Sequence, residues 1–218
     1  WTKMKAIYPF VGGTATAHKW NLKDPRDLDA AFRLVFNGGW THSSTGATPN
    51  GTNGYADTKF NANTNLTNGN FHLSFYSRTN STSGLFSAEM LLLSTYMSSG
   101  WVNLRTNNKL SGTAGLSFGD DATEGAYASS ITAGFMVGTE TSNSLRKVFK
   151  NNSLLVQNTT TSTTAITSSN IALSGSTVSN YSANQTAFTS MGDGLTDTDA
   201  ANLYTRVQAY QTSLSRNV

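Results

Sequence analysis

The sequence predicts an all-β fold, a β-sandwich closed by one short α-helix at the C-terminal end. Several segments alternate apolar and polar residues with a period of two, as half-buried strands do. Between these segments the chain is rich in Gly, Ser, Thr and Asn, which favour turns. Only from Thr196 onward do apolar residues recur at spacings of three and four, which is the period of a helix.

The composition fits one folded domain over residues 1–218. A chain of 218 residues can bury a sizeable core, and no linker or change in composition divides it. Apolar residues make up only 37% of the chain, but 11% of its residues are aromatic, which argues against disorder. Because the sequence starts at Trp1, we expect it to be a processed chain or part of a longer polypeptide.

The charge pattern argues against several classes of function. The net charge is +3, only 12% of residues are charged, and the densest basic run, residues 146–150, is short. Nucleic-acid binding is therefore not expected.

The absence of cysteine excludes disulfides and thiolate metal sites and is compatible with an extracellular protein. No apolar run is long enough to span a membrane, so membrane insertion is not expected, and no signal peptide is recognisable.

The N-terminal part of the chain is predicted to enter the fold through an edge strand. Residues 6–11 are mostly apolar, and Pro9 restricts them to a sheet edge or a bulge because proline has no backbone donor. Asp24 followed by Pro25 is typical of the first turn of a helix. A strand is expected over residues 31–36, and frequent turn signals with short strands between them follow.

Two strongly alternating strands come next, separated by a more uniformly apolar strand over residues 85–96. The first, residues 71–78, has Phe71, Leu73 and Phe75 on one side. Its polar side consists of His72, Ser74, Tyr76 and Arg78. In the second, residues 101–105, apolar Val102 and Leu104 are expected to point inward. The side chains expected to point outward are Trp101, Asn103 and Arg105.

These outward side chains form a candidate glycan-binding surface if the two strands are neighbours in one sheet. Sugar rings stack on Trp and Tyr, while Asn and Arg hydrogen-bond to hydroxyl groups. The candidate residues are Trp101, Asn103, Arg105, His72, Tyr76 and Arg78. The same pattern also fits an ordinary solvated sheet face, or a face covered by a neighbouring subunit.

Further strands and the closing helix complete the prediction. Residues 131–137 alternate, residues 148–156 form a hairpin that turns at two Asn residues, and two short strands follow.

Thr196 is the expected N-cap of the closing helix, with a carboxylate three positions later. The apolar stripe of the helix is Ala200, Leu203, Val207, Tyr210 and Leu214. We expect this stripe to pack on its own sandwich, the alternative being a trimer axis for which it is short.

Three C-terminal motifs resemble those of concanavalin A-like, laminin-G-like jelly-roll domains. They are a Phe-Lys-Asn-Asn-Ser-Leu-Leu hairpin at residues 149–155, a strand ending in Gly at residues 171–175, and the strand-to-helix corner at residues 192–204. Asn152 stands where the family usually has Gly, which leaves the turn type open but keeps the hairpin. The resemblance implies an all-β, concanavalin A-like jelly-roll β-sandwich with a short C-terminal α-helix.

Two N-terminal runs, residues 8–25 and 38–53, are similar to phage-encoded proteins that carry this domain. This resemblance implies a non-enzymatic structural or adhesion domain of a phage virion, in a tail fibre, spike or head fibre. The expected partners are other virion proteins and a homo-oligomeric assembly, with a trimer as the candidate. A bacterial surface glycan is the candidate ligand, and the expected location is the virion or the extracellular space. The alternatives are a carbohydrate-binding module attached to a secreted glycoside hydrolase, and a glycosidase whose carboxylates come from separate strands.

Acidic residues and histidines provide few candidates for a metal or catalytic site. Asp120, Asp121 and Glu124 could supply oxygen ligands to Ca²⁺, but they lack the spacing of a dedicated loop, and a solvated turn is the favoured interpretation. The histidines stand far apart without metal-ligand spacing: His18, His42 and His72. Glucanases of this fold carry a Glu-x-Asp-x-Glu run, which is absent here, so no enzymatic activity and no cofactor are expected.

Overall fold

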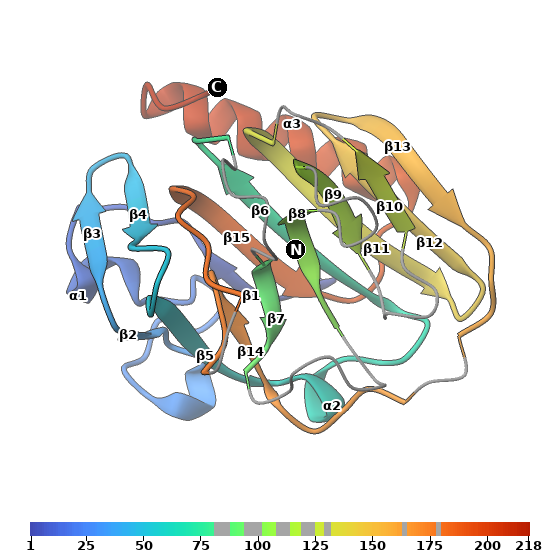
Figure 1. The fold of residues 1–218 in the computed structure, drawn as a ribbon, viewed down its shortest axis with the longest axis horizontal. Coiled ribbons are helices and arrows are strands. Elements are labelled where there is room, and N and C mark those ends of the chain that lie inside the picture. Colours follow the sequence, from blue (N-terminus) through green and yellow to red (C-terminus); the bar gives the residue numbers. More distant parts are fainter. Residues whose placement is uncertain are drawn as a thin grey trace.

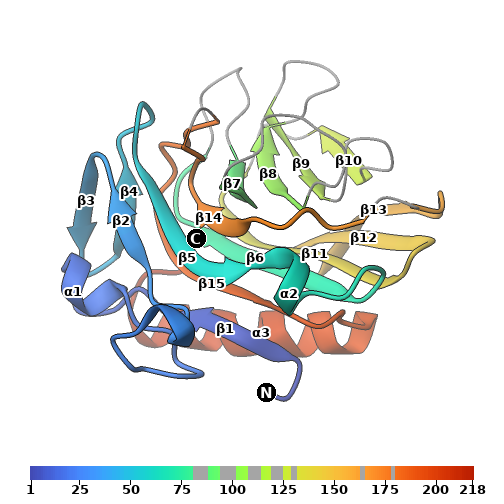
Figure 2. The same ribbon diagram turned by 90° about the horizontal axis from the view of Figure 1, so that it is seen from below.

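Two antiparallel sheets lie face to face, and helix α3 (Asp197–Ser213) covers the outer side of one of them (Figures 1 and 2). The structure is a computed structural model. It describes residues 1–80, 88–93, 102–107, 114–118, 125–128, 132–162, 165–177 and 180–218. The predicted β-sandwich of jelly-roll type with a C-terminal helix is confirmed.

The larger sheet has eight strands, in the order β13-β12-β11-β6-β15-β4-β3, with β1 also pairing with β15. Its strands are β1 (Met4–Tyr8), β3 (Trp40–Ser43), β4 (Gly46–Pro49), β6 (Phe71–Ser77), β11 (Gly134–Ser142), β12 (Leu145–Lys150), β13 (Ser153–Asn158) and β15 (Thr186–Gly192). At its centre, β6 pairs with β11 from Phe71 to Ser77 and with β15 from His72 to Ser77. Segments far apart in the sequence therefore meet in the middle of this sheet.

The smaller sheet has seven strands, in the order β10-β9-β8-β7-β14-β5-β2. Its strands are β2 (Val35–Asn37), β5 (Tyr55–Asn61), β7 (Ala88–Leu92), β8 (Leu104–Asn107), β9 (Ala114–Phe118), β10 (Gly125–Ala128) and β14 (Asn170–Leu173). Short helical turns connect strands of the two sheets: α1 (Ala15–His18), η1 (Asp29–Ala31) and α2 (Ala62–Asn65). The helical turn expected at Asp24 is displaced to η1, because Asp24 instead forms an isolated bridge with Asn21.

The main core lies between the two sheets. Phe71, Leu73 and Phe75 of β6 point into it, as their alternation predicts, together with Leu104 of β8 and Leu173 of β14. The predicted hairpin is also confirmed, since β12 and β13 pair and turn at Asn151 and Asn152. Both Asn residues have positive φ, at 46° and 68°, which is the backbone of a type I′ turn.

A second core lies between the larger sheet and α3. Ala200 and Val207 are each 3% exposed, and Leu203 and Tyr210 pack partly buried against the same cluster. The prediction that the stripe packs on its own sandwich is therefore confirmed for these four residues. It is wrong for Leu214, which is 41% exposed because the helix ends at Ser213. No described helix combines the length and hydropathy that crossing a bilayer requires.

Candidate functional site

The two strands expected to share a polar face lie in different sheets. The strand that carries His72, β6, is at the centre of the larger sheet, whereas β8, which carries Arg105, belongs to the smaller one. The condition that the two strands are neighbours in one sheet is therefore not met, and no single sheet face combines them. Alternation in sequence specifies the two faces of each strand but not the strand beside it. Trp101 lies outside the described residues.

The polar side of β6 faces α3 instead of solvent. His72, Ser74 and Tyr76 are each fully buried, so His72 and Tyr76 are not available to a ligand on this face. Arg78, just beyond the strand, is half-buried, and its guanidinium donates to the carbonyl of Arg216 at 2.9 Å. The predicted exposure of this face is wrong because α3 covers it, while its polar side chains bond to Asp193, Ser190 and Val218 on neighbouring segments.

Asn103 and Arg105 are buried as well, at 1% and 4% exposure. They alternate with Val102 and Leu104, whose side chains belong to the main core. The two polar residues therefore lie on the opposite side of the chain, as predicted, but the expected solvent exposure is wrong.

The acidic candidates for Ca²⁺ binding cannot be placed. Asp120, Asp121 and Glu124 lie outside the described residues. Within the described ranges, no group of three His, Asp or Glu side chains is arranged to hold a metal ion.

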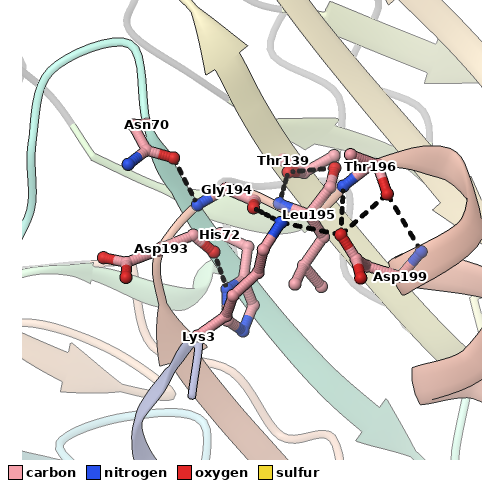
Figure 3. Close-up of polar contacts among 9 residues, drawn as sticks. All are labelled: Lys3, Asn70, His72, Thr139, Asp193, Gly194, Leu195, Thr196 and Asp199. Atoms are coloured by element: carbon pink, nitrogen blue, oxygen red, sulfur yellow. Dashed lines mark hydrogen bonds and ion pairs between the residues drawn. The ribbon is translucent and has the colours of Figure 1, made fainter. Parts of the chain in front are cut away.

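Side chains from several elements fix the corner between β15 and α3 (Figure 3). The Asp193 carbonyl accepts a hydrogen bond from His72 Nδ1 at 2.7 Å. The Gly194 N–H donates to Asn70 Oδ1 at 2.9 Å, and Lys3 Nζ donates to the Gly194 carbonyl at the same distance. Each of these backbone groups therefore has a partner from a distant part of the sequence.

The rest of the corner is held by Thr139 and by the helix cap. Thr139 Oγ1 accepts from the Leu195 N–H at 2.8 Å and donates to the Leu195 carbonyl at 3.0 Å. Thr196 and Asp199 form the predicted capping box, each side chain bonding to the other residue's backbone N–H. Hydrogen bonds, chiefly from Lys3, lower the pKa of Asp199 to about 2. These bonds make the corner a structural joint between β15 and α3.

A row of polar side chains continues beneath α3. Because a carbonyl only accepts, His72 carries its proton on Nδ1, and its Nε2 accepts from Ser190 Oγ at 3.2 Å. The Ser74 and Ser190 hydroxyls lie 2.6 Å apart. Burial lowers the pKa of His72 to about 4, so its imidazole is neutral near pH 7. This His–Ser pair cannot meet a substrate, because both residues are fully buried.

The structure brings two histidines together that the sequence separates. His18 Nδ1 lies 3.0 Å from His42 Nδ1, and His18 Nε2 accepts from the Gly13 N–H at 3.2 Å. Burial lowers the pKa of His18 to about 4 and also lowers that of His42. The rings pack among Phe10 and Phe36, so the expectation that these histidines stand apart is wrong, while their role as packing residues is retained.

Ion pairs or buried hydrogen bonds hold the described Asp and Glu side chains. Every Asp in the described ranges forms an ion pair with a Lys or Arg, as does Glu140 with Arg146. Glu89 is buried and accepts hydrogen bonds from Ser182 and Asn184 at 2.8 and 2.7 Å. The resolved carboxyl pKa shifts, at Asp24, Asp27 and Asp199, are all downward. These three carboxyl groups are therefore ionised near pH 7.

A groove between β1 and α3, hereafter the β1–α3 groove, is an open concave surface of about 510 Å³. Its floor is apolar and consists of Met4, Ile7, Phe188, Leu195 and Val207. Its walls are Trp1 and Leu22 on one side, and Leu203 and Tyr210 of α3 on the other. Polar residues of the rim are Lys3, Asp199, Asn202 and Arg206. No sequence pattern predicts this groove, although the helical stripe supplies one of its walls.

Comparison with known proteins identifies the fold. No protein-family description and no curated protein sequence matches the chain. The structure is similar to domain 4 of AbnA, a GH43 extracellular arabinanase from Geobacillus stearothermophilus, solved in complex with arabinotriose. That similarity has a TM-score of 0.66 and 13% identity over 93% of this chain and 98% of the other.

The structure is also similar to the binding domain of botulinum neurotoxin DC, solved in complex with rat synaptotagmin II. The TM-score is 0.60 at 12% identity, with 95% of this chain covered. The binding domain of botulinum neurotoxin serotype D gives 0.58 at 11% identity. The chain spans about half the length of these toxin domains, 52% in both cases. At such identities, the likeness shows that the chain shares their β-sandwich fold.

Proposed function

We propose that this chain is a non-catalytic recognition domain that acts outside the cell and binds a glycan. The observation that carries the non-catalytic part is the state of the described carboxylates, which are all held by ion pairs or buried hydrogen bonds. Domain 4 of AbnA, which has the same fold along nearly its whole length, was solved with an oligosaccharide, and this supports a glycan as the ligand.

We place the domain in a phage virion, as a structural or adhesion part of a tail fibre, spike or head fibre. The N-terminal runs at residues 8–25 and 38–53 support this setting. We propose a homo-oligomer, with a trimer as the candidate and other virion proteins as partners. Because α3 packs Ala200 and Val207 against its own sheet, a trimer would use another surface.

A second candidate is a carbohydrate-binding module of a secreted glycoside hydrolase. The similarity to a domain of an extracellular arabinanase specifically favours this alternative. Electron microscopy of phage particles labelled with antibodies against the domain separates the two settings, because only a virion protein is labelled there. Light scattering of the purified chain tests whether it is a trimer.

A glycan array that carries bacterial surface polysaccharides and plant arabinans tests the ligand class. Trp101 remains the candidate stacking residue, so Trp101→Ala should abolish binding through loss of the ring face. Trp1→Ala is the matched control, since Trp1 is 72% exposed and lies in the β1–α3 groove. Absence of binding to every glycan would contradict the ligand class. Turnover of a polysaccharide by the purified chain would contradict the non-catalytic assignment.

A further inference from the structure

The two neighbouring histidines are joined to the backbone in one chain of hydrogen bonds. The Gly13 N–H donates to His18 Nε2 at 3.2 Å, so this nitrogen carries no proton. The proton of the neutral His18 ring is therefore on Nδ1, which donates to His42 Nδ1 at 3.0 Å. His42 then carries its own proton on Nε2. The backbone of Gly13 thus fixes the tautomers of both rings.

Neither ring can take up a proton while both hydrogen bonds remain. The pair has two unprotonated nitrogens, His18 Nε2 and His42 Nδ1, and each of them accepts one of the two bonds. A proton on His18 Nε2 would face the Gly13 N–H, and a proton on His42 Nδ1 would face the Nδ1–H of His18. A backbone N–H only donates, so it cannot adapt to either change. Protonation therefore breaks the chain of bonds.

His72 shows that burial alone does not have this consequence. Its Nε2 accepts from the Ser190 hydroxyl, which also lies 2.6 Å from the Ser74 hydroxyl. A hydroxyl both donates and accepts, so Ser190 can turn toward Ser74 and accept from a protonated His72. His72 thus keeps its partners when it is charged, whereas the pair of His18 and His42 loses a bond.

A positive charge from another element opposes protonation of the pair. Arg216 lies on the segment after α3. Burial, the charge of His42 and the charge of Arg216, in that order, lower the pKa of His18 to about 4. A charged His18 is therefore repelled from its neutral-state position.

The other elements around the pair supply no negative charge to compensate. Lys19, next to His18 in the chain, is already paired with Asp27. The neighbouring strands β2 and β4 present Phe36 and Ala47 to His42, and neither residue titrates. Among the described residues, no carboxylate favours the charged form of either ring.

The pair holds the turn over residues 10–18, which includes α1, beside β3 (Figures 1 and 2). β3 ends the strand order of the larger sheet, so this turn lies at a sheet edge. Gly13 packs closely there, since a β-carbon on it would lie 3.2 Å from the Ser44 backbone nitrogen. The Phe10 ring packs edge-on against His18, with 5.5 Å between the ring centres. Loss of the bonds at His18 therefore removes the polar attachment of the whole turn.

From this geometry we propose that the pair of His18 and His42 is an acid-operated latch, which holds the turn over residues 10–18 on β3 when neutral and releases it when protonated. Release uncovers the end of the larger sheet without requiring the centre of the sheet to unfold. The latch lies apart from the candidate glycan-binding residues and does not depend on glycan recognition.

The direction of the effect follows from the protons bound in each form. The released histidines have ordinary pKa values near 6.5, whereas the pKa of His18 in the closed form is about 4. The released form therefore binds more protons between these values. Its population should rise about tenfold for each pH unit of acidification and for each proton taken up.

Hydrogen exchange of the full chain, followed by NMR from pH 7 to about pH 4.5, tests the latch. Protection of the Gly13 amide, corrected for the intrinsic exchange rate, should fall about tenfold per pH unit below 6.5. Amides at the centre of β6 should stay more strongly protected at each pH, because they exchange only when the sheet itself opens.

The double variant His18→Gln with His42→Gln removes both titrating rings and keeps amide groups that donate and accept. It should abolish the pH dependence of Gly13 protection. His72→Gln is the matched control, because it makes the same substitution at another buried histidine, and it should leave that dependence unchanged. The proposal is overturned if the double variant keeps the pH dependence, or if His72→Gln removes it.

Nitrogen-15 NMR of the wild-type imidazoles at pH 7 provides a second test that requires no variant to fold. The latch requires a protonated Nδ1 on His18 and a protonated Nε2 on His42. The opposite tautomer of either ring would overturn the proposal.

Discussion

The guanidinium of Arg216 is fully buried and donates to the carbonyl of Phe10 at 2.7 Å, which joins the segment after α3 to the segment after β1. Its other partners are equally neutral: the carbonyls of Pro9 and Ala187, each at 2.9 Å, and Gln211 Oε1 at 2.7 Å. Phe10 has a φ of 51°, an unfavourable conformation for a bulky residue. The buried cation therefore secures a strained turn without any carboxylate.

Arg216→Met should lower the free energy of unfolding by about 3 kcal/mol, because the carbonyls it serves would remain buried without donors. Urea denaturation measures the change. Arg206→Met, on the exposed face of α3, is the control and should change stability by less than about 0.5 kcal/mol. If both variants were equally stable, the bonds of Arg216 would not support the fold.

Thr139→Val should cost about 2 kcal/mol, since the methyl group that replaces the hydroxyl leaves both the N–H and the carbonyl of Leu195 unbonded. The shape of the side chain is retained, so packing should change little. Thr205→Val is the matched control on the exposed side of α3. Thermal and urea unfolding of the two variants should differ clearly, and an equal effect would contradict the role of Thr139 at the corner.

Stability should fall as the pH is lowered from about 6.5 to 4. The pKa of His72 is about 4 in the folded chain and near 6.5 when unfolded, so the unfolded state binds more protons in this window. His72 alone contributes up to about 3 kcal/mol, and His18 acts in the same direction. Asp199 adds a further loss only below its unfolded pKa of 3.8, down to about 2.

The measurement for this pH dependence is urea unfolding at pH 7 and pH 5 for wild type and His72→Gln. The variant should lose less stability between the two pH values, because only His18 then titrates from a strongly lowered pKa. An identical loss in both proteins would show that His72 is not the group responsible.

Val207→Ala should lower the free energy of unfolding by about 1–2 kcal/mol, because Val207 is 3% exposed against the larger sheet. Leu214→Ala should be nearly neutral, although both residues belong to the same apolar stripe, because Leu214 is 41% exposed. Calorimetry of the two variants decides between packing on the sandwich and packing on a second copy. In the latter case Leu214→Ala would weaken the oligomer.

Much of the fold could be predicted from local patterns. The period of two in β6 correctly placed Phe71 and Leu73 in the main core, because side chains on a strand alternate strictly. The Asn151–Asn152 turn and the Thr196 cap were predictable because each depends on neighbouring residues only.

The candidate site could not be predicted, since it depends on which elements meet. Alternation marked His72 and Tyr76 as polar-face residues, but the helix that covers them is more than a hundred residues further along the chain. Likewise, His18 and His42 face each other only because the turn after β1 packs against β3. The β1–α3 groove combines the two ends of the described chain, for which no local pattern exists.

The polar row beneath α3 has a consequence for the order in which the chain folds. The residues that lead into the helix bond to His72 of β6 and Thr139 of β11, and His72 in turn bonds to Ser190 of β15. Only the completed centre of the larger sheet brings these three strands together. Pairings between such distant segments form slowly, because long loops must close first. We therefore expect α3 to dock late and, in doing so, to seal the buried imidazole and hydroxyl groups from water.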